Sequence, residues 1–353
     1  TLRFLWMPEM TGTYAFLAAN EERIPRMVAG LNLDMVGQDQ AQCDSSFLIE
    51  RPPDSLPSFA PDLLIHLRER LFPEVKSHAK MGGYPLFRHA VTSFSGGSDH
   101  YIFSDPSVGV PMPMIIQWPD KFYHTTADTL DRVDPAMLGK VCLLAATYGY
   151  WLAQADQTEA RWLGAEMSAR FRQRIIGLVQ EAVTEADEEG GLSGDDLRRR
   201  IEYRVDRHRE ALASLTRLAP LDVSGWQADD GDFARAELVH AAGVLPEGRD
   251  DVEEDAVAAR LIPRRLFRGP VPGYAHLLDE AGRDEWWEFR QRMGKEASRA
   301  LPALAQYWAD GQRTVGEIGR LIALETELEV TPLLVEYFRF AQRLGVVDLV
   351  EKG

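Results

Sequence analysis

The side chains best suited to chemistry lie in short stretches of the first 130 residues. "WMPEM" contains Glu9, "NLDMVG" contains Asp34 and "YHTTADT" contains His124. Each is expected at or just beyond the end of a strand, and the ends of parallel strands converge on one edge of a sheet. Two carboxylates and an imidazole at one edge form a donor set suited to zinc. Taken singly, the same residues are equally explained as a strand-end Glu, a loop-capping Asp and a loop histidine.

A fourth stretch, "SGGSDH", places Asp99 and His100 at the expected start of a helix. Asp99 acts there either as a helix N-cap or as support for a nearby site, and we assign both residues a supporting role. Ser98 does not form a hydrolase triad with them, because adjacent residues cannot line up as nucleophile, base and orienting acid. The sequence also lacks a G-x-S-x-G motif.

Residues around His124 suggest how a site would be completed. Asp128 follows at short range and is suited to fix the tautomer of a ligating imidazole. Three aromatic residues, Trp118, Phe122 and Tyr123, flank the loop. They line a pocket for an apolar substrate side chain, or they are packing residues.

The composition is that of a globular protein, with 45% hydrophobic and 27% charged residues among 353. The net charge of −16 disfavours a nucleic-acid partner. Cys43 and Cys142 make no disulfide framework and are expected to be small buried residues. We expect no membrane-spanning run and a cytoplasmic location. The oligomeric state stays open, a homo-oligomer included.

Strand-like and helix-like segments alternate over residues 1–154, which predicts an α/β sandwich with a mainly parallel sheet. The expected strands are "LRFLWM", "MVAGLNLDMVG", "FLIER" and "MPMIIQW". The expected helices are "GTYAFLAANEE", "FAPDLLIHLRERLF" and a segment from Asp134 onward. Asp134 as N-cap and Pro135 at the first helical position favour that last start.

The remainder has a different character. Residues 155–297 are expected to form a helical extension without clear strands, interrupted by the acidic loops "EADEEGGLSGDD" and "PEGRDDVEED" and the extended connector "LIPRRLFRGPVPG". Residues 298–353 are expected to form a separate module. Thr314 and Glu317 make a capping box, Thr331 and Pro332 start a second helix that stops at Gly345, and "VVDLV" is a strand. Helix, turn, helix and strand are the layout of a winged helix.

The order of the motifs resembles the co-catalytic zinc aminopeptidases. The segments "NLDMVG", "SDHYIF", "GVP" and "YHTTADT" carry the resemblance, which covers residues 1–154. That family includes bacterial leucyl aminopeptidase, and glutaminyl cyclase shares its fold. The remainder resembles the C-terminal extension of a bacterial branch that adds helices and a winged helix, through "LIPRRLFRGP" and "YWADGQRTVGEI". The excess of Arg over Lys also suggests a GC-rich bacterial source.

The resemblance implies two zinc ions, with Asp34 a ligand of one and His124 a ligand of the other. Two adjacent glutamates usually follow the first strand, one as base and one as ligand, whereas this chain has Pro8 and Glu9. Glu9 therefore fits either role. The family's further His and bridging Asp lie upstream of the first strand, and no His precedes His66. We expect the missing ligands before Thr1, in a longer parent protein.

The sequence thus predicts a zinc-dependent hydrolase that cleaves the amide bond of a peptide or small amide next to a free amine. One alternative is a non-catalytic peptidase-like scaffold with a winged-helix interaction module, although its last helix carries only Arg339 and Arg343 as a basic face. A second alternative treats Thr1 as an N-terminal nucleophile that uses its own amine as base.

Overall fold

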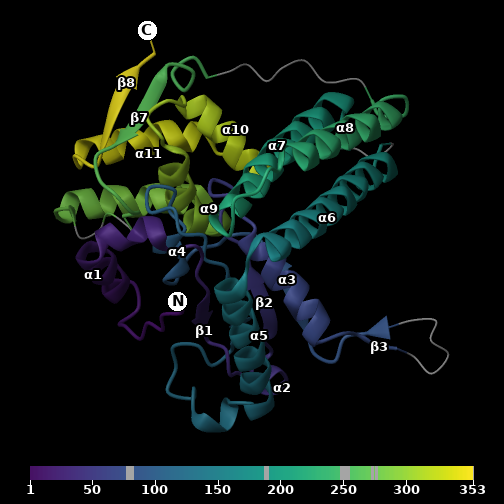
Figure 1. Ribbon diagram of the computed structural model, residues 1–353. Coiled ribbons are helices and arrows are strands. Elements are labelled where there is room, and N and C mark those ends of the chain that lie inside the picture. Colours follow the sequence, from purple (N-terminus) through teal and green to yellow (C-terminus); the bar gives the residue numbers. More distant parts are fainter. Residues whose placement is uncertain (77–82, 187–190, 247–254, 272–273, 275–276, 353) are drawn as a thin grey trace.

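The computed structural model describes the chain except residues 77–82, 187–190, 247–254, 272–273, 275–276 and 353. The second acidic stretch predicted as a loop, residues 246–255, falls almost entirely on 247–254, outside the described residues. The first, residues 185–196, lies outside them only at 187–190, and the loop prediction is wrong at its end, because residues 194–196 begin a helix capped by Ser193. Figure 1 shows a sheet flanked by helices, a group of long helices projecting from it, and a further helical part that carries the C-terminus.

The main sheet contains four strands in the order β1 (Asn32–Asp34), β6 (Met114–Trp118), β2 (Ser46–Glu50) and β5 (His89–Thr92). β1 pairs with β6 and β2 with β5 in parallel, while β2 and β6 are antiparallel. The mainly parallel α/β sheet is therefore confirmed. Asp34 lies opposite Ile116, so the chain leaves β1 and β6 at the same edge of the sheet.

One of the predicted strands is wrong, and another is much shorter than predicted. Residues 1–7 form no strand. Leu2 lies beside Gly149 of helix α5, and Phe4 and Trp6 are largely exposed, so the apolar residues of this segment have no sheet to join. The strand predicted over "MVAGLNLDMVG" is reduced to Asn32–Asp34. Met35, directly after it, has a positive φ of 50°, which is incompatible with extended backbone.

The helices of the first 154 residues follow the sequence more closely. They are α1 (Thr11–Ala19), α2 (Gln40–Cys43), α3 (Ala60–Leu71), α4 (His100–Phe103) and α5 (Pro135–Gln154). The Asp134 side chain accepts a hydrogen bond from the backbone N–H of Ala136, which confirms the predicted N-cap. Beside α3, two short strands, β3 (Val75–Lys76) and β4 (Gly83–Tyr84), pair with each other.

Helix α5 also corrects two expectations drawn from composition. It is 20 residues long with a mean hydropathy of 1.2, so by length and composition it passes as a membrane span, contrary to the prediction of no such run. One side of it, including Met137, Val141 and Leu144, packs into the sheet core. Cys142 lies on the exposed side, whereas Cys43 is buried as expected.

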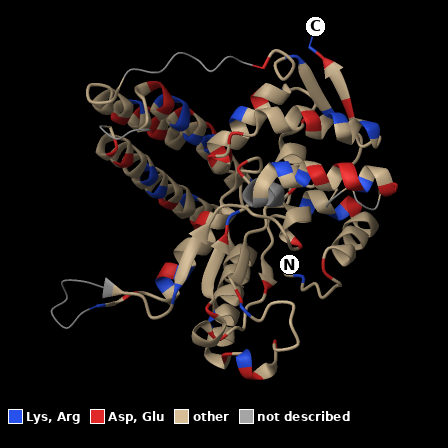
Figure 2. Cartoon of the chain, turned by 180° about the vertical axis from the view of Figure 1, so that it is seen from behind, with Lys and Arg blue, Asp and Glu red and all other residues tan. Residues whose placement is uncertain are grey.

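Three long helices follow, α6 (Gln157–Thr184), α7 (Gly194–Ala213) and α8 (Ser224–Ala241). They pack against one another around a small apolar core that includes Phe171, Ile175 and Leu197. Acidic and basic side chains alternate along the helices rather than gathering on one face in the view of Figure 2. Such mixing is typical of solvated helix surfaces and explains why the sequence of this region is so highly charged.

The last part contains α9 (Glu280–Trp308), α10 (Val315–Thr326), α11 (Thr331–Arg343) and β8 (Val347–Glu351). The capping box of Thr314 and Glu317 is confirmed. The predicted connector "LIPRRLFRGPVPG" is wrong in its first half, because residues Leu261–Arg265 form strand β7, which pairs with β8. The partner of this strand, β8, lies far along the sequence, so the local residue pattern of "LIPRR" did not predict a strand.

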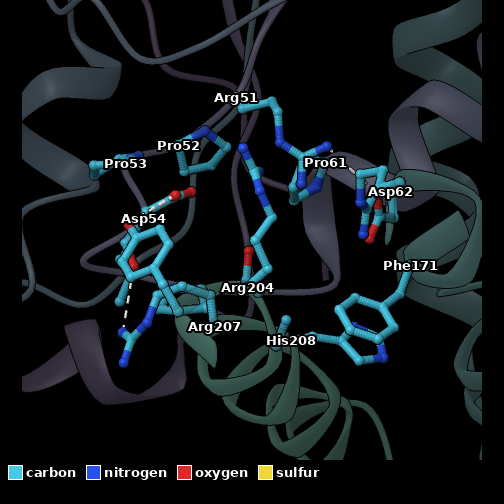
Figure 3. Close-up of a pocket in the computed structure, with 16 residues that line it drawn as sticks. Arg51, Pro52, Pro53, Asp54, Pro61, Asp62, Phe171, Arg204, Arg207 and His208 are labelled. Atoms are coloured by element: carbon cyan, nitrogen blue, oxygen red, sulfur yellow. Dashed lines mark hydrogen bonds and ion pairs between the residues drawn. The ribbon is translucent and has the colours of Figure 1, made fainter. Parts of the chain in front are cut away.

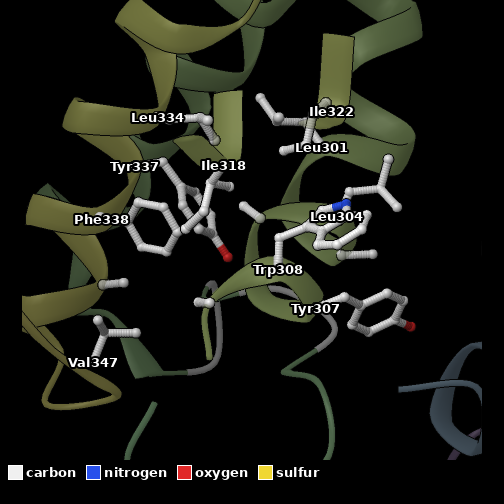
Figure 4. Packing of buried hydrophobic residues seen from close by; sticks show 14 of the residues in the cluster. Leu301, Leu304, Tyr307, Trp308, Ile318, Ile322, Leu334, Tyr337, Phe338 and Val347 are labelled. Atoms are coloured by element: carbon white, nitrogen blue, oxygen red, sulfur yellow. The ribbon is translucent and has the colours of Figure 1, made fainter. Parts of the chain in front are cut away.

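The C-terminal helices share one apolar core with the first 112 residues. Trp308, Tyr337 and Phe338 are buried at its centre (Figure 4), and Ile102 and Val110 belong to the same cluster. The Tyr307 hydroxyl donates a 2.5 Å hydrogen bond to the carbonyl of Tyr101. Helix α9 also runs through the boundary placed at residue 298. The division into domains 1–154, 155–297 and 298–353 stays a prediction, as does the winged helix.

Candidate active site

Glu9 lies in a tight turn that leads into α1. The backbone N–H of Gly12 donates to the carbonyl of Pro8 at 2.8 Å, and Met10 has a positive φ of 59°. The Asp99 carboxylate accepts hydrogen bonds from the Met10 backbone N–H at 2.8 Å and from the Thr13 hydroxyl at 2.6 Å. Asp99 therefore makes no cap for its own helix, α4, and instead holds the turn that presents Glu9.

Asp34 is half-buried at the end of β1, and Asn32 lies two residues before it. Side chains two apart on a strand share a face of the sheet. The Asn32 amide donates a 2.8 Å hydrogen bond to the Ser98 hydroxyl, and its nitrogen also lies 3.5 Å from Nδ1 of His100. The face of β1 that carries Asp34 is thereby joined to the "SDH" segment.

His124 projects from the loop after β6 on a residue with a positive φ of 56°, a conformation that is uncommon for residues other than glycine. Its ring stacks on Tyr123 with 3.7 Å between centroids, and Tyr123 meets Trp118 edge-on at 5.1 Å. The imidazole is exposed and has no hydrogen-bond partner within the described part of the chain. Its ring nitrogens are therefore available to a ligand.

The electrostatic surroundings of Glu9 connect these residues. Partial burial raises the pKa of the Glu9 carboxyl above its ordinary value, and the nearby carboxylates of Asp34 and Asp99 raise it further. A hydrogen bond with the Ser98 side chain and the proximity of His124 act in the opposite direction. Asp34 and His124, which are far from Glu9 in the sequence, thus both lie within electrostatic reach of its carboxyl.

The donor types at this place fit zinc, since carboxylate oxygen and imidazole nitrogen are both common zinc ligands. Their number is smaller than a closed site needs. Among the residues that the structure describes, no group of three or more His, Cys, Asp or Glu side chains is close enough together to hold one ion. Asp34, His124 and Glu9 therefore form no closed metal site in the described structure, and they stay candidate ligands.

The other predicted site residues divide into two groups. Tyr123 stacks on the His124 ring, and Trp118 contacts Tyr123. Phe122 instead packs under the guanidinium of Arg132, with the charge 4.4 Å from the ring centroid. Asp128 is exposed, and its backbone N–H donates to the carbonyl of Thr125. No hydrogen bond joins Asp128 to the His124 ring within the described residues, so the predicted support of the imidazole is not visible here.

Sequence reasoning missed Glu50. Its buried carboxylate lies 2.7 Å from Nε2 of His100 and accepts hydrogen bonds from the Ser95 hydroxyl at 2.6 Å and the Ser95 backbone N–H at 2.8 Å. It also accepts from the backbone N–H of Gly96 at 3.2 Å. Glu50 thereby fixes the whole "SGGSDH" loop. The sequence did offer a signal for this residue. Glu50 ends the apolar stretch "FLIE", and an acid at the end of a buried strand needs buried hydrogen-bond partners.

One of three comparisons with known proteins identifies a family. Residues 9–149 match the model of peptidase family M28, a range that begins at Glu9 and includes Asp34 and His124. No curated protein matches the chain. A candidate peptidase from Clostridium acetobutylicum is similar in structure, with 13% identity and a TM-score of 0.29, over 97% of this chain and 47% of that one. The chain spans about half the length of that protein, and a score this low carries no argument.

Proposed function

Since residues 9–149 belong to peptidase family M28, we propose that the chain is a zinc-dependent aminopeptidase-like hydrolase, which cleaves an amide next to a free amine. The observation that carries the proposal is the convergence of Glu9 with Asp34 and His124 inside the matched range. Asp34 ends β1 and His124 lies in the loop after β6, at the sheet edge where α/β folds bind their ligands, and both act electrostatically on Glu9.

Zinc is the cofactor expected of the family, and the family resemblance implies two ions. Asp34 and His124 are the residues of this chain that would hold zinc, and the exposed ring of His124 leaves its nitrogens available. When bound, zinc supplies Lewis-acid activation of a water molecule and of the scissile carbonyl. Further ligands would complete the coordination.

Glu9 is proposed as the general base. Its raised pKa brings the carboxyl closer to neutral pH, which improves both the acceptance and the return of a proton. The carboxylate takes a proton from the attacking water and passes it to the leaving amine. Asp99 serves this step indirectly, because its hydrogen bonds to Met10 and Thr13 hold the turn that aims Glu9.

The neighbouring residues support a substrate with a free amino end. Asp34 and Asp99 add negative charge around Glu9, which favours binding of a substrate ammonium group. Trp118 and Tyr123 offer aromatic faces beside His124 for an apolar side chain. A leucine-like first residue is therefore the proposed preference.

The test is hydrolysis of leucine p-nitroanilide by the purified chain supplied with zinc. We expect release of p-nitroaniline that a chelator stops and added zinc restores. The N-acetylated substrate serves as the matched control and should react far more slowly, because it lacks the free amine. Equal hydrolysis of both substrates would refute the aminopeptidase assignment, and hydrolysis untouched by the chelator would refute the role of zinc.

A second candidate, a peptidase-like scaffold without catalysis, is favoured by one observation. No group of three metal-binding side chains occurs among the described residues. Its DNA-binding version has little support, since Arg343 on helix α11 is paired with Glu285 and leaves Arg339 as the main charge of that face. A chain that binds no zinc, hydrolyses neither substrate and retards DNA in an electrophoretic assay would establish this version.

A further inference from the structure

A small pocket lies between the proline-rich loop after β2 and the helices α3, α6 and α7 (Figure 3). Its volume is about 70 Å³, enough for a compact ion and too small for a nucleotide. The residues that line it come from the loop, from the start of α3 and from facing turns of α6 and α7. Its charged and hydroxyl-bearing residues include Arg51, Asp54, Ser58, Asp62, Arg174, Arg204 and Arg207. Four arginines at one small pocket are unexpected in a chain with a net charge of −16.

Two of the arginines share a single acid. Nη1 of Arg174 lies 3.0 Å and Nη1 of Arg51 lies 3.5 Å from Oδ1 of Asp62. Burial opposes ionisation of Asp62, but the charges of Arg174 and Arg51 outweigh it and lower the pKa of Asp62 to about 2. One carboxylate is therefore shared by two guanidinium groups, and the charge of Asp54 also acts on Arg51.

The other two arginines differ from each other. Arg207 is paired with Glu210 at 2.7 Å, and its Nε is buried without a hydrogen-bond partner. Arg204 has no hydrogen bond and no ion pair within the described residues, and its side chain extends toward Arg51 and Pro52 in Figure 3. Asp54, the remaining acid of the lining, already accepts a hydrogen bond from the Tyr203 hydroxyl at 2.9 Å. Arg204 is thus the cation available to a ligand.

Ser58 gives an independent sign of a ligand. Ser58 lines the pocket and is only 5% exposed, yet its hydroxyl has no hydrogen-bond partner in the described structure. Buried hydroxyl groups are nearly always hydrogen-bonded, because an unsatisfied one costs stability. A buried O–H donor in a pocket lined by several arginines is best satisfied by an anionic oxygen.

We infer that this pocket binds a phosphate group, held by Arg204, Arg51 and Arg174 with the hydroxyl of Ser58. The donors reach the pocket from the loop and from two helices, so they approach from several directions. A tetrahedral oxyanion can accept from all of them, whereas one arginine fork already satisfies a planar carboxylate. The site is separate from the proposed hydrolytic residues, and its occupancy does not depend on zinc.

The test is calorimetric titration of the full chain with inorganic phosphate at constant ionic strength. We expect the wild type to bind phosphate saturably, with a Kd below about 10 mM. Arg204→Gln should weaken binding about tenfold or more, because it removes a charge-assisted hydrogen bond. Arg204 has no partner to lose, so the variant should fold normally. Arg199→Gln, on the same helix but outside the pocket, is the matched control and should bind like the wild type.

Titrations with related anions identify the ligand. O-Phosphoserine that binds as well as inorganic phosphate would identify the phosphate group of a larger molecule, and binding of inorganic phosphate alone would identify the free ion. Acetate should bind far more weakly. Absence of phosphate binding by the wild type, equal affinity in Arg204→Gln, or acetate binding as tight as phosphate would each overturn the inference. Glu9→Gln should retain phosphate binding, which separates this site from the proposed hydrolase.

Discussion

The carboxylate of Asp99 accepts a 2.8 Å hydrogen bond from the backbone N–H of Met10, a residue 89 positions away in the sequence. The same oxygen accepts from Thr13 at 2.6 Å. A residue of the "SDH" stretch thereby fixes the turn that carries Glu9, so two segments that looked independent in the sequence act as one unit.

This relationship predicts that Asp99→Ala lowers kcat by about 10- to 100-fold with little change in KM, as is typical when a residue that supports a site is removed. Asp99→Asn keeps an acceptor oxygen and should restore most of the activity. Steady-state kinetics on leucine p-nitroanilide would measure both, with thermal melting as the check on folding. Equal activity in Asp99→Ala and the wild type would contradict the positioning role.

The sequence predicted those features of the fold that neighbouring residues determine, and it did not predict those that depend on distant partners. Helix starts such as Asp134–Pro135 and the capping box of Thr314 and Glu317 are set by neighbouring residues, and the structure has them where expected. Strand β7 depends on a partner strand far along the chain, since Leu261 pairs with Glu351, 90 residues away, and it was not predicted. Residues 1–7 had strand composition but no partner strand.

The candidate site divides in the same way. Glu9, Asp34 and His124 were predicted from residue type, position and the order of motifs, and the structure brings them within electrostatic reach. The partners of Asp99 and His100 were not predicted. Met10, Thr13 and Glu50 contact them through the tertiary fold alone, and no spacing along the chain encodes those contacts.

The buried pair of Glu50 and His100 should be a main determinant of stability. Glu50→Ala leaves His100 and the Ser95–Gly96 backbone without their acceptor, so we expect a loss of about 3 kcal/mol in the free energy of unfolding. His100→Ala should cost a similar amount, and the double variant less than the sum of the two. Urea denaturation measures all three. Strict additivity of the two losses would mean that the residues do not interact.

Arg265 and Asp105 connect strand β7 to the first part of the chain through a buried, two-pronged ion pair at 2.7 and 2.9 Å. Arg265→Ala should destabilise the protein by about 3–5 kcal/mol, because Asp105 is left buried and uncompensated. The neighbouring pair Arg264–Asp348 is exposed, so Arg264→Ala is the matched control with an expected loss below about 1 kcal/mol. Equal losses in the two variants would contradict the role of burial.

Glu325 makes stability depend on pH. Burial, and then the nearby Asp54, raise the pKa of Glu325 to about 8, while its oxygens accept from the Asp54 backbone N–H and the Trp308 indole. The folded state then holds a proton that the unfolded state releases near its ordinary pKa of 4.5. The contribution of this group to stability is therefore complete at acidic pH and is lost as the pH rises toward about 8.

The measurement is chemical denaturation at several pH values, compared between wild type and Glu325→Gln. The wild type should lose at most about 1.4 kcal/mol per pH unit from this group between the two pKa values. Glu325→Gln cannot titrate, so its profile should be flatter over that range. Parallel profiles for the two proteins would show that Glu325 does not carry the dependence.

The most direct test of the account is the zinc content and activity of Asp34→Ala and His124→Ala after equilibration with zinc and gel filtration. We expect each variant to retain less zinc than the wild type and to lose leucine p-nitroanilide hydrolysis, because each removes one donor from the shared site. His240→Ala, which removes an exposed histidine on α8, should match the wild type. Wild-type zinc content and activity in both site variants would contradict the central claim.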